Sequence, residues 1–504
     1  MKDTRLIELL KSFSPEEMSG LEKYISSPFF SRKRDVAPIF KTVKKFYPDF
    51  DSDDLTNENI YHKLFPGKKF GDKKSDNLIR TLTSELLRSC KDFLAYVEFG
   101  SDENRKKFYL LNQLRRKKNY REFDKEYSSL INEDFKDGGE FVQTLMEKYF
   151  IKSVYMNYSL NRDRFDEAFH SMMKTREYSV VAALVNSFKF ENEKLLATGY
   201  NLKVGTTAVD SLINNTDAGE ILEDMKKNNS EFYPYVFTFY LVYKMNREKN
   251  GNEYYFKLKK HLNDYLNLFS RSDQYMFYSI LATYCSSRTD RAEKDSFREE
   301  LFEIYDNTLK NGIYKILDKE DIHIVLFRNI VNNAAQLKKF DWLEKFIEKY
   351  SAELHKDHRE NMTFYALANL FYEKGEYEKS LEQILKIKFD LFLYKLDIRI
   401  LLMKIYYELN YSEQAFSLYD SFLNYLKSAK NFPDHTKISG INFLKYTKML
   451  MRIKEKEHIS SDDLKVLSHK LKEENHVLSF DWLSEKINQL NLYVNKKKTS
   501  RKIF

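Results

Sequence analysis

The residues most able to support chemistry are two histidines near the middle of the chain. His355 and His358 stand three residues apart in HKDH, with Glu353 and Glu360 close by, and imidazole and carboxylate groups are common zinc ligands. A third ligand at a recognisable spacing does not follow, and the segment is polar. We therefore interpret it as a solvent-exposed turn between helices and predict no metal site.

Other motifs that bind phosphate or build a nucleophile are incomplete. The GKK at Gly67 lacks both the upstream glycine and the following Ser or Thr of a phosphate-binding loop. Neither GxGxxG nor GxSxG occurs in the sequence. The acidic pair Asp462 and Asp463 follows Ser460, where helix capping explains it. We predict no catalytic residue and no cofactor. An enzyme of unrecognised type stays an alternative, ranked after the two non-catalytic functions given at the end of this section.

The cysteines and the N-terminus indicate a reduced, cytoplasmic protein. Cys90 and Cys285 are the two cysteines, and each lies in an apolar helical stretch, so both are predicted to be buried thiols. Asp3 and Glu8 interrupt the apolar segment that a signal peptide would need. No uncharged run approaches the roughly 18 residues of a membrane helix, so we predict no membrane insertion.

Two basic clusters leave a second interpretation open. The net charge is +8, which by itself does not indicate nucleic-acid binding. Much of it lies in the C-terminal segment NLYVNKKKTSRKIF, which contains no acidic residue. These clusters are either solvated helix ends or an electrostatic contact with nucleic acid or anionic lipid. Their members are Arg115, Arg116, Lys117 and Lys118, and Lys496, Lys497, Lys498, Arg501 and Lys502.

The elements that carry these residues are predicted to be helices. The chain has only 13 Gly and 7 Pro, and few turn formers favour helices joined by short connections. Residues 1–103 are predicted to form an N-terminal domain, a small bundle of roughly four or five helices. Ser14 before Pro15 and Thr56 each begin a helix as a cap, and a long amphipathic helix spans about 75–99.

From residue 104 onward the sequence repeats one pattern, an apolar helix, a short polar turn, an aromatic residue and a second helix. The aromatic positions are Tyr120, Phe165, Phe340, Tyr377 and Tyr411. The last three lie 37 and 34 residues apart. A period in the mid-thirties is typical of a helix-turn-helix solenoid, in which each hairpin buries its apolar face against its neighbours.

The stretch NMTFYALANLFYEKGEYEKSLEQILKI resembles a tetratricopeptide repeat. Its residues at the packing positions of the motif are Phe364, Leu367, Ala368, Phe371, Gly375, Tyr377, Ser380, Ile384 and Ile387. The resemblance is clearest over 324–430 and implies an all-α fold, with a right-handed α-solenoid over 104–492 and a basic tail over 493–504. Whether residues 175–300 keep a regular superhelix stays open, because their glycines and Asn/Asp run suggest a longer connection.

The four-residue motif FDWL occurs twice, beginning at Phe340 and at Phe480, and the two copies contain both tryptophans of the chain. Asp341 and Asp481 are predicted to cap a helix, and Glu344 completes a capping box in the first copy. The tryptophans are predicted to pack between adjacent hairpins. The alternative is an exposed aromatic anchor for a partner.

The resemblance also implies a concave groove lined by the first helix of each hairpin. Arg328 and Asn332 resemble the first half of a clamp with which some tetratricopeptide proteins hold a carboxylate. The rest of the clamp is missing, because Ala366, Asp397 and Leu401 stand at its other positions. The groove is therefore predicted to bind an extended or helical peptide. Its predicted lining residues are Arg328, Asn332, Tyr365, Asn369, Tyr372 and Lys404.

The function predicted from these features is that of a non-catalytic scaffold or adaptor that binds a protein or peptide of unknown identity. The alternative is a regulatory or nucleic-acid-binding helical protein that uses the basic clusters at 115–118 and 496–502.

Overall fold

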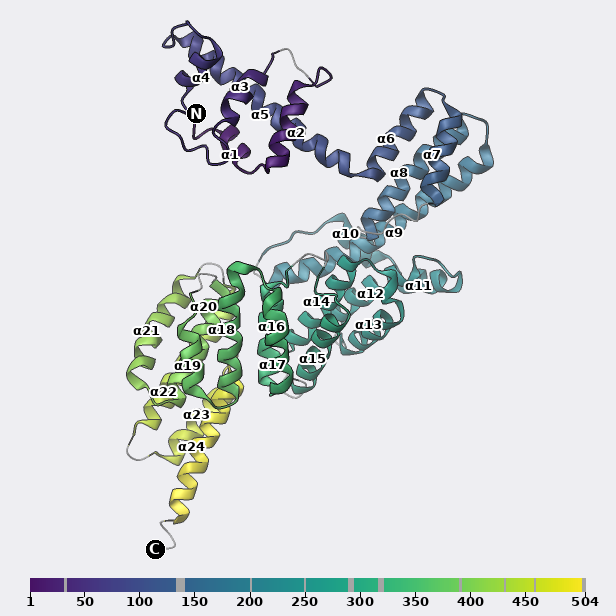
Figure 1. Cartoon of the computed structure of the whole chain (residues 1–504). Helices are drawn as coiled ribbons and strands as arrows, with labels where there is room; N and C mark the ends of the chain where they lie inside the picture. Colours follow the sequence, from purple (N-terminus) through teal and green to yellow (C-terminus); the bar gives the residue numbers. More distant parts are fainter. Residues whose placement is uncertain are drawn as a thin grey trace. The chain divides into compact units, whose positions relative to one another are not determined.

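In its described part the computed structural model of the chain consists of helices and the connections between them (Figure 1). Within that part no residue lies in a β-strand, which confirms the all-α prediction. The solenoid arrangement of hairpins stays a prediction. The described residues are 1–30, 34–132, 141–199, 202–248, 251–288, 294–315, 321–388, 392–429, 432–456 and 459–500.

The chain forms two compact units, Met1–Lys136 with Glu147–Arg176, and Asp137–Met146 with Glu177–Phe504. The domain boundaries predicted at 103 and 492 stay predictions.

The N-terminal helices begin where their capping residues predict. The Ser14 hydroxyl accepts from the Glu17 amide at 3.1 Å, and the Glu17 carboxylate accepts from the Ser14 amide at 2.8 Å. Thr56 accepts from the Asn59 amide at 3.1 Å. These helices enclose a core of their own, which includes buried Cys90. They are α1 (Arg5–Lys11), α2 (Pro15–Ser26), α3 (Ala37–Lys44), α4 (Asn57–Leu64) and α5 (Lys73–Ser101).

The next helices pack through aromatic rings. The Phe123 ring stacks on Tyr158 with centroids 3.9 Å apart, and Tyr127 stacks on Tyr155 at 4.0 Å. These residues belong to a second core. The helices are α6 (Glu103–Arg116), α7 (Tyr120–Asn132), α8 (Phe141–Leu160) and α9 (Phe165–Gly199).

The segment whose glycines and Asn/Asp run suggested a longer connection contains two short helices, α10 (Ala208–Asn215) and α11 (Ala218–Lys227), after a non-helical stretch. Longer helices follow, and α12 packs on α13 and α14 on α15. Cys285 is buried there, as predicted. These helices are α12 (Tyr233–Arg247), α13 (Gly251–Tyr265), the 3-10 turn η1 (Leu266–Leu268), α14 (Arg271–Ser287) and α15 (Lys294–Lys310).

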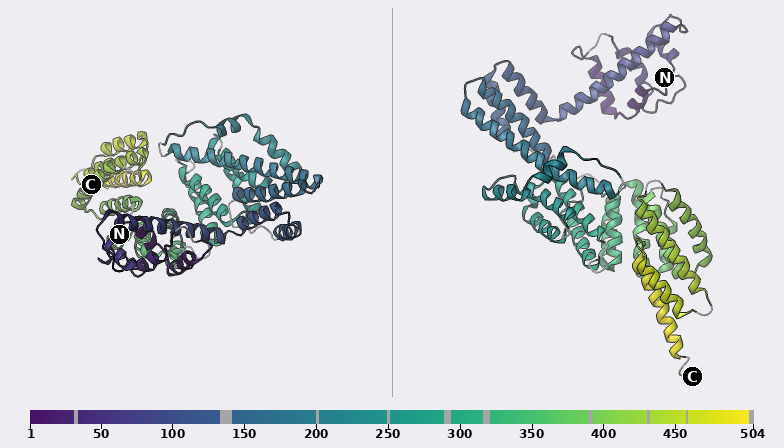
Figure 2. Two further views of the ribbon diagram at one scale, coloured as in Figure 1. Left: turned by 90° about the horizontal axis from the view of Figure 1, so that it is seen from above. Right: turned by 180° about the vertical axis from the view of Figure 1, so that it is seen from behind.

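In the C-terminal part each helix packs on its neighbours in sequence, and α18 also contacts α16 and α20. The last helix, α24, packs against α22 and α23 (Figure 2). The elements are α16 (Ile324–Gln336), α17 (Phe340–Tyr350), the 3-10 turn η2 (Ser351–Glu353), α18 (Lys356–Glu373), α19 (Tyr377–Leu385), α20 (Phe392–Glu408), α21 (Ser412–Ser428), α22 (Asp434–Lys454), α23 (Ser461–Glu473) and α24 (Phe480–Ser500).

The prediction that Asp341 and Asp481 cap the helices at the two FDWL motifs is wrong. Helix α17 begins at Phe340, so Asp341 lies in its first turn, and the N-cap is Lys339 without a side-chain bond. Helix α24 likewise begins at Phe480, with Asp481 in its first turn. The reason is the turn before each helix. Lys338, with a φ of 55°, reverses the chain before α17, and Ser479, with a φ of 51°, does so before α24, so that the aromatic residue is the first helical one.

Candidate functional site

The predicted groove residues lie on α16, α18 and α20, and several of them form hydrogen bonds within the protein. Arg328 on α16 and Asp397 on α20 form an ion pair in which Nη2 donates to Oδ1 at 2.7 Å and Nε donates to Oδ2. Their side chains are 23% and 14% exposed. The pair therefore ties two helices together in a partly dry environment, where such bonds are strong.

Tyr365 on α18 joins the same network. Its hydroxyl lies 2.7 Å from Asn332 Oδ1 and 3.1 Å from Asp397 Oδ2, and its side chain is buried. Burial, followed by the Asp397 charge, raises the pKa of Tyr365 well above its ordinary value. Asn369 Nδ2 donates to the Tyr365 carbonyl at 2.9 Å. We call Arg328, Asn332, Tyr365 and Asp397 the polar network.

Lys404, the predicted groove residue on α20, differs from the polar network in how its charged group is bonded. Among the described residues its ammonium has no hydrogen bond and no ion pair, and Nζ lies 5.8 Å from the centroid of the Trp482 ring. The side chain is half-buried. Burial lowers the pKa of Lys404 to about 8, while the Glu373 charge opposes that shift. Burial in turn raises the pKa of Glu373.

Trp482 reaches Lys404 because the start of α24 is bound to distant helices. The Asp481 carboxylate accepts from Lys294 at 2.8 Å and from Arg298 at 2.7 Å, both on α15. The Trp482 ring packs edge-on against Tyr407 of α20, with centroids 5.2 Å apart. These contacts place the start of α24 beside the predicted groove residue Lys404.

Further along α24, Lys486 pairs with Glu408 of α20 at 2.7 Å, and these side chains are only 7% and 12% exposed. Neither this ion pair nor that of Arg328 with Asp397 was predicted, because about 70 to 80 residues separate the two members of each pair and no local pattern joins them. The other tryptophan, Trp342, donates to Asp306 of α15 at 3.2 Å and packs on Phe302, so it lies between α15 and α17.

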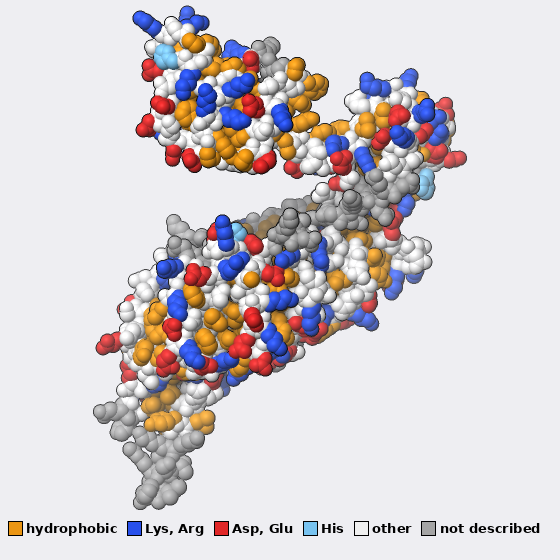
Figure 3. Space-filling model, in the orientation of Figure 1, with side chains coloured by type: hydrophobic (Ala, Val, Ile, Leu, Met, Phe, Trp, Pro, Cys, Tyr) orange, Lys and Arg blue, Asp and Glu red, His pale blue; other side chains and the backbone are white. Residues whose placement is uncertain are grey.

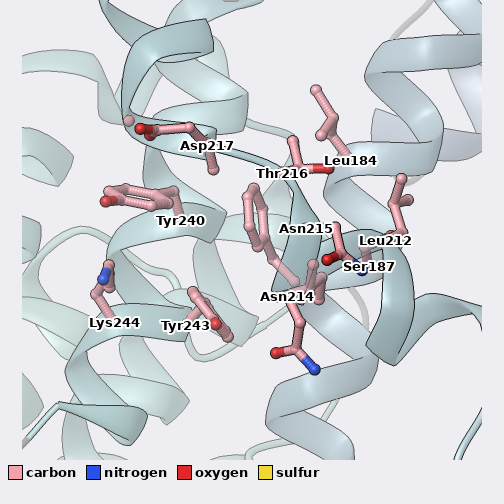
Figure 4. Close-up of a pocket in the computed structure, with 14 residues that line it drawn as sticks. Leu184, Ser187, Leu212, Asn214, Asn215, Thr216, Asp217, Tyr240, Tyr243 and Lys244 are labelled. Carbon is pink, nitrogen blue, oxygen red and sulfur yellow. The ribbon is translucent and has the colours of Figure 1, made fainter.

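A separate pocket of about 420 Å³ lies between α9, the connection from α10 to α11, and α12 (Figure 4). From the sequence, its Asn/Asp run was predicted only to be a connection. Phe188 packs against Tyr240 and Tyr243, with centroid distances of 5.7 and 5.4 Å. Other lining residues are Leu184, Ser187, Leu212, Ile213, Asn214, Asn215, Thr216, Asp217, Ala218, Gly219 and Lys244.

The basic clusters are only partly described. Arg116, Lys117 and Lys118 are exposed at the end of α6, whereas Arg115 is half-buried. On the face seen in Figure 3, acidic and basic side chains are interspersed. The side chains of Lys496, Lys497 and Lys498, and the residues Arg501 and Lys502, lie outside the described part of the structure.

The HKDH segment forms the start of α18 rather than a free turn. His355 is its N-cap, and Nδ1 accepts from the Asp357 amide at 3.4 Å. Within the described ranges no cluster of histidine, cysteine and carboxylate side chains is suited to a metal ion. Nor does any described helix have the length and apolar composition needed to cross a membrane.

Comparisons with protein-family models, with curated proteins and with solved structures gave no match for this chain.

Proposed function

We propose that this chain is a non-catalytic, cytoplasmic scaffold of the tetratricopeptide-like α-solenoid type, in which α16, α18 and α20 form the floor of a groove for a protein or peptide. The partner that fits this groove presents an acidic side chain or a terminal carboxylate to Lys404.

The observation that carries this proposal is the ammonium of Lys404 beside Trp482, which has neither a hydrogen bond nor an ion pair within the part of the chain that the structure describes. A half-buried charge without a partner costs free energy, because it has lost part of its hydration and gained no hydrogen bond. A carboxylate from a partner would form a charge-assisted bond there and recover that cost. The adjacent Trp482 ring is buried in the core, where it packs on Tyr407 and holds the start of α24 beside the lysine.

The polar network supports the same function in a different way. Arg328, Asn332 and Tyr365 were predicted to contact the partner, but their polar groups already bond within the protein. Their role in the proposal is to hold α16, α18 and α20 in fixed positions. A surface that is ordered before binding loses less conformational entropy when the partner arrives.

The proposal is tested by selecting peptides from a random display library on the full chain. We expect the selected peptides to share Asp, Glu or a free C-terminus, and to bind Lys404→Met about tenfold or more weakly, since bonds to charged groups contribute about 1.5–3 kcal/mol. Lys465→Met is the control, because this lysine is 72% exposed on α23. Equal affinity for both variants would overturn the proposal.

A further inference from the structure

We propose that the pocket between α9, the α10–α11 connection and α12 is a second binding site, which takes a neutral aromatic ring bearing an amide or hydroxyl group. This site is independent of the proposed groove at Lys404.

The shape of the pocket suits one ring. Its volume of about 420 Å³ falls in the range of roughly 300–1,000 Å³ that is common for small organic ligands. Buried Leu184 and Phe188 supply apolar lining, and Leu212, 43% exposed, adds an apolar residue near the solvent. A ring that leaves water for this environment gains free energy by burying apolar surface, and the neighbouring aromatic faces favour offset or edge-on contacts.

The charges around the pocket favour a neutral ligand. The Lys244 ammonium lies 5.9 Å from the Tyr240 ring and pairs with Glu248 at 2.7 Å. The Arg247 guanidinium lies 5.5 Å from the Tyr243 ring. Both tyrosine rings therefore already face a cation, which disfavours a cationic ligand.

An anionic ligand is disfavoured by the negative charge of Asp217. Asp217 lines the pocket, and its Oδ1 caps α11 by accepting from the Glu220 amide at 3.1 Å. The positive charge of Lys244 is offset by its ion pair with Glu248, so the Asp217 carboxylate would repel a second anion nearby.

The polar lining matches an amide or hydroxyl group. Asn214 Oδ1 accepts from Arg247 at 3.3 Å, which leaves its NH₂ group as a donor. Asn215 Nδ2 donates to the Ser211 carbonyl at 2.8 Å, which leaves its Oδ1 as an acceptor. Figure 4 shows these two residues and Thr216 across the pocket from Tyr240. A ligand with both a donor and an acceptor can therefore bond to neutral groups.

The small residues of α11 keep the pocket open. A Cβ atom added to Gly219 would lie 3.2 Å from Asp217 Oδ1 and 3.9 Å from the Tyr240 hydroxyl. A larger side chain at this position is therefore a direct way to fill the space. Gly100 on α5 has no atom within 4 Å of an added Cβ and provides the matched control.

The test is ligand-observed NMR titration of the full chain with N-acetyl-tyrosinamide and p-cresol, compared with N-acetyl-lysinamide and the corresponding glutamate amide. We expect the two aromatic probes to bind and the two charged probes to bind at least about tenfold more weakly. Tighter binding of N-acetyl-tyrosinamide than of p-cresol indicates a peptide side chain as the natural ligand, and equal binding indicates a free aromatic molecule.

Gly219→Leu is expected to weaken aromatic binding about tenfold or more, through overpacking of the filled site, while Gly100→Leu leaves it unchanged. Thermal melting of each variant monitors folding. If Gly219→Leu does not fold, Tyr240→Phe serves instead, because it keeps the ring and removes one hydrogen-bonding group, and about threefold weaker binding is expected. Absence of aromatic binding, or equal binding of the charged probes, would overturn the proposal.

Discussion

Arg328 and Asp397 lie 69 residues apart in the sequence and are joined by two hydrogen bonds between α16 and α20, one of them 2.7 Å long. Tyr365 of α18 lies 3.1 Å from the same carboxylate. Three helices that supply the predicted groove thus meet at one ion pair, which makes this pair the structural centre of the polar network.

Asp397→Ala should lower the free energy of unfolding by about 3 kcal/mol, because it leaves the Arg328 charge in a partly dry site without its partner. Urea unfolding followed by tryptophan fluorescence measures this, since Trp342 and Trp482 lie in the same unit as the pair. Asp462→Ala on the surface of α23 is the control and should have a much smaller effect. The double variant Arg328→Met with Asp397→Leu should recover most of the loss, and failure of the single variant to destabilise would contradict the assigned role.

Gly251→Ala should destabilise the protein by about 1–3 kcal/mol through overpacking. An added Cβ atom would lie 2.4 Å from the Met245 carbonyl oxygen and 2.7 Å from the Tyr284 hydroxyl, and the carbonyl belongs to the backbone of α12. Gly100→Ala, in open space on α5, is the matched control and should be neutral or slightly stabilising. Thermal unfolding distinguishes the two, and equal melting temperatures would show that the close contact at Gly251 is absent.

Lys404→Met should stabilise the protein at pH 7, and the gain should shrink as the pH rises. Burial holds the pKa of Lys404 at about 8 in the folded protein, against an ordinary value of 10.5. Below pH 8 both states are protonated, so the wild type carries the full cost of the buried charge. Between about pH 8 and 10.5 the unfolded state binds more protons, so the wild type gains stability relative to the variant. A gain that is constant from pH 7 to pH 10.5, measured by urea unfolding, would contradict this cause.

The sequence predicted those features that depend on nearby residues. Ser14 and Thr56 cap the helices that their types indicated, and the thiols of Cys90 and Cys285 are buried, which raises their pKa values to about 12 and about 11. The turn residue Lys338 was missed, because a lysine at a φ of 55° carries none of the signal that a glycine gives.

Features that depend on distant residues could not be predicted in the same way. Asp397 differs from the residue expected for a carboxylate clamp, and only the packing of α18 against both α16 and α20 makes it the partner of Arg328. Similarly, Asp481 was interpreted as a local cap, whereas its carboxylate binds Arg298, 183 residues earlier. The pocket at Phe188 combines three separate segments, so no single stretch of sequence indicates it.

The most direct test of the proposed scaffold function is the affinity of a selected acidic peptide for the full chain as a function of pH. Wild-type affinity should fall as the pH rises above about 8, where Lys404 loses its proton. The Lys404→Arg variant should retain its affinity at high pH, because a guanidinium stays protonated. An affinity that is independent of pH, or that falls equally in both proteins, would contradict the assignment of Lys404 as the group that binds the partner.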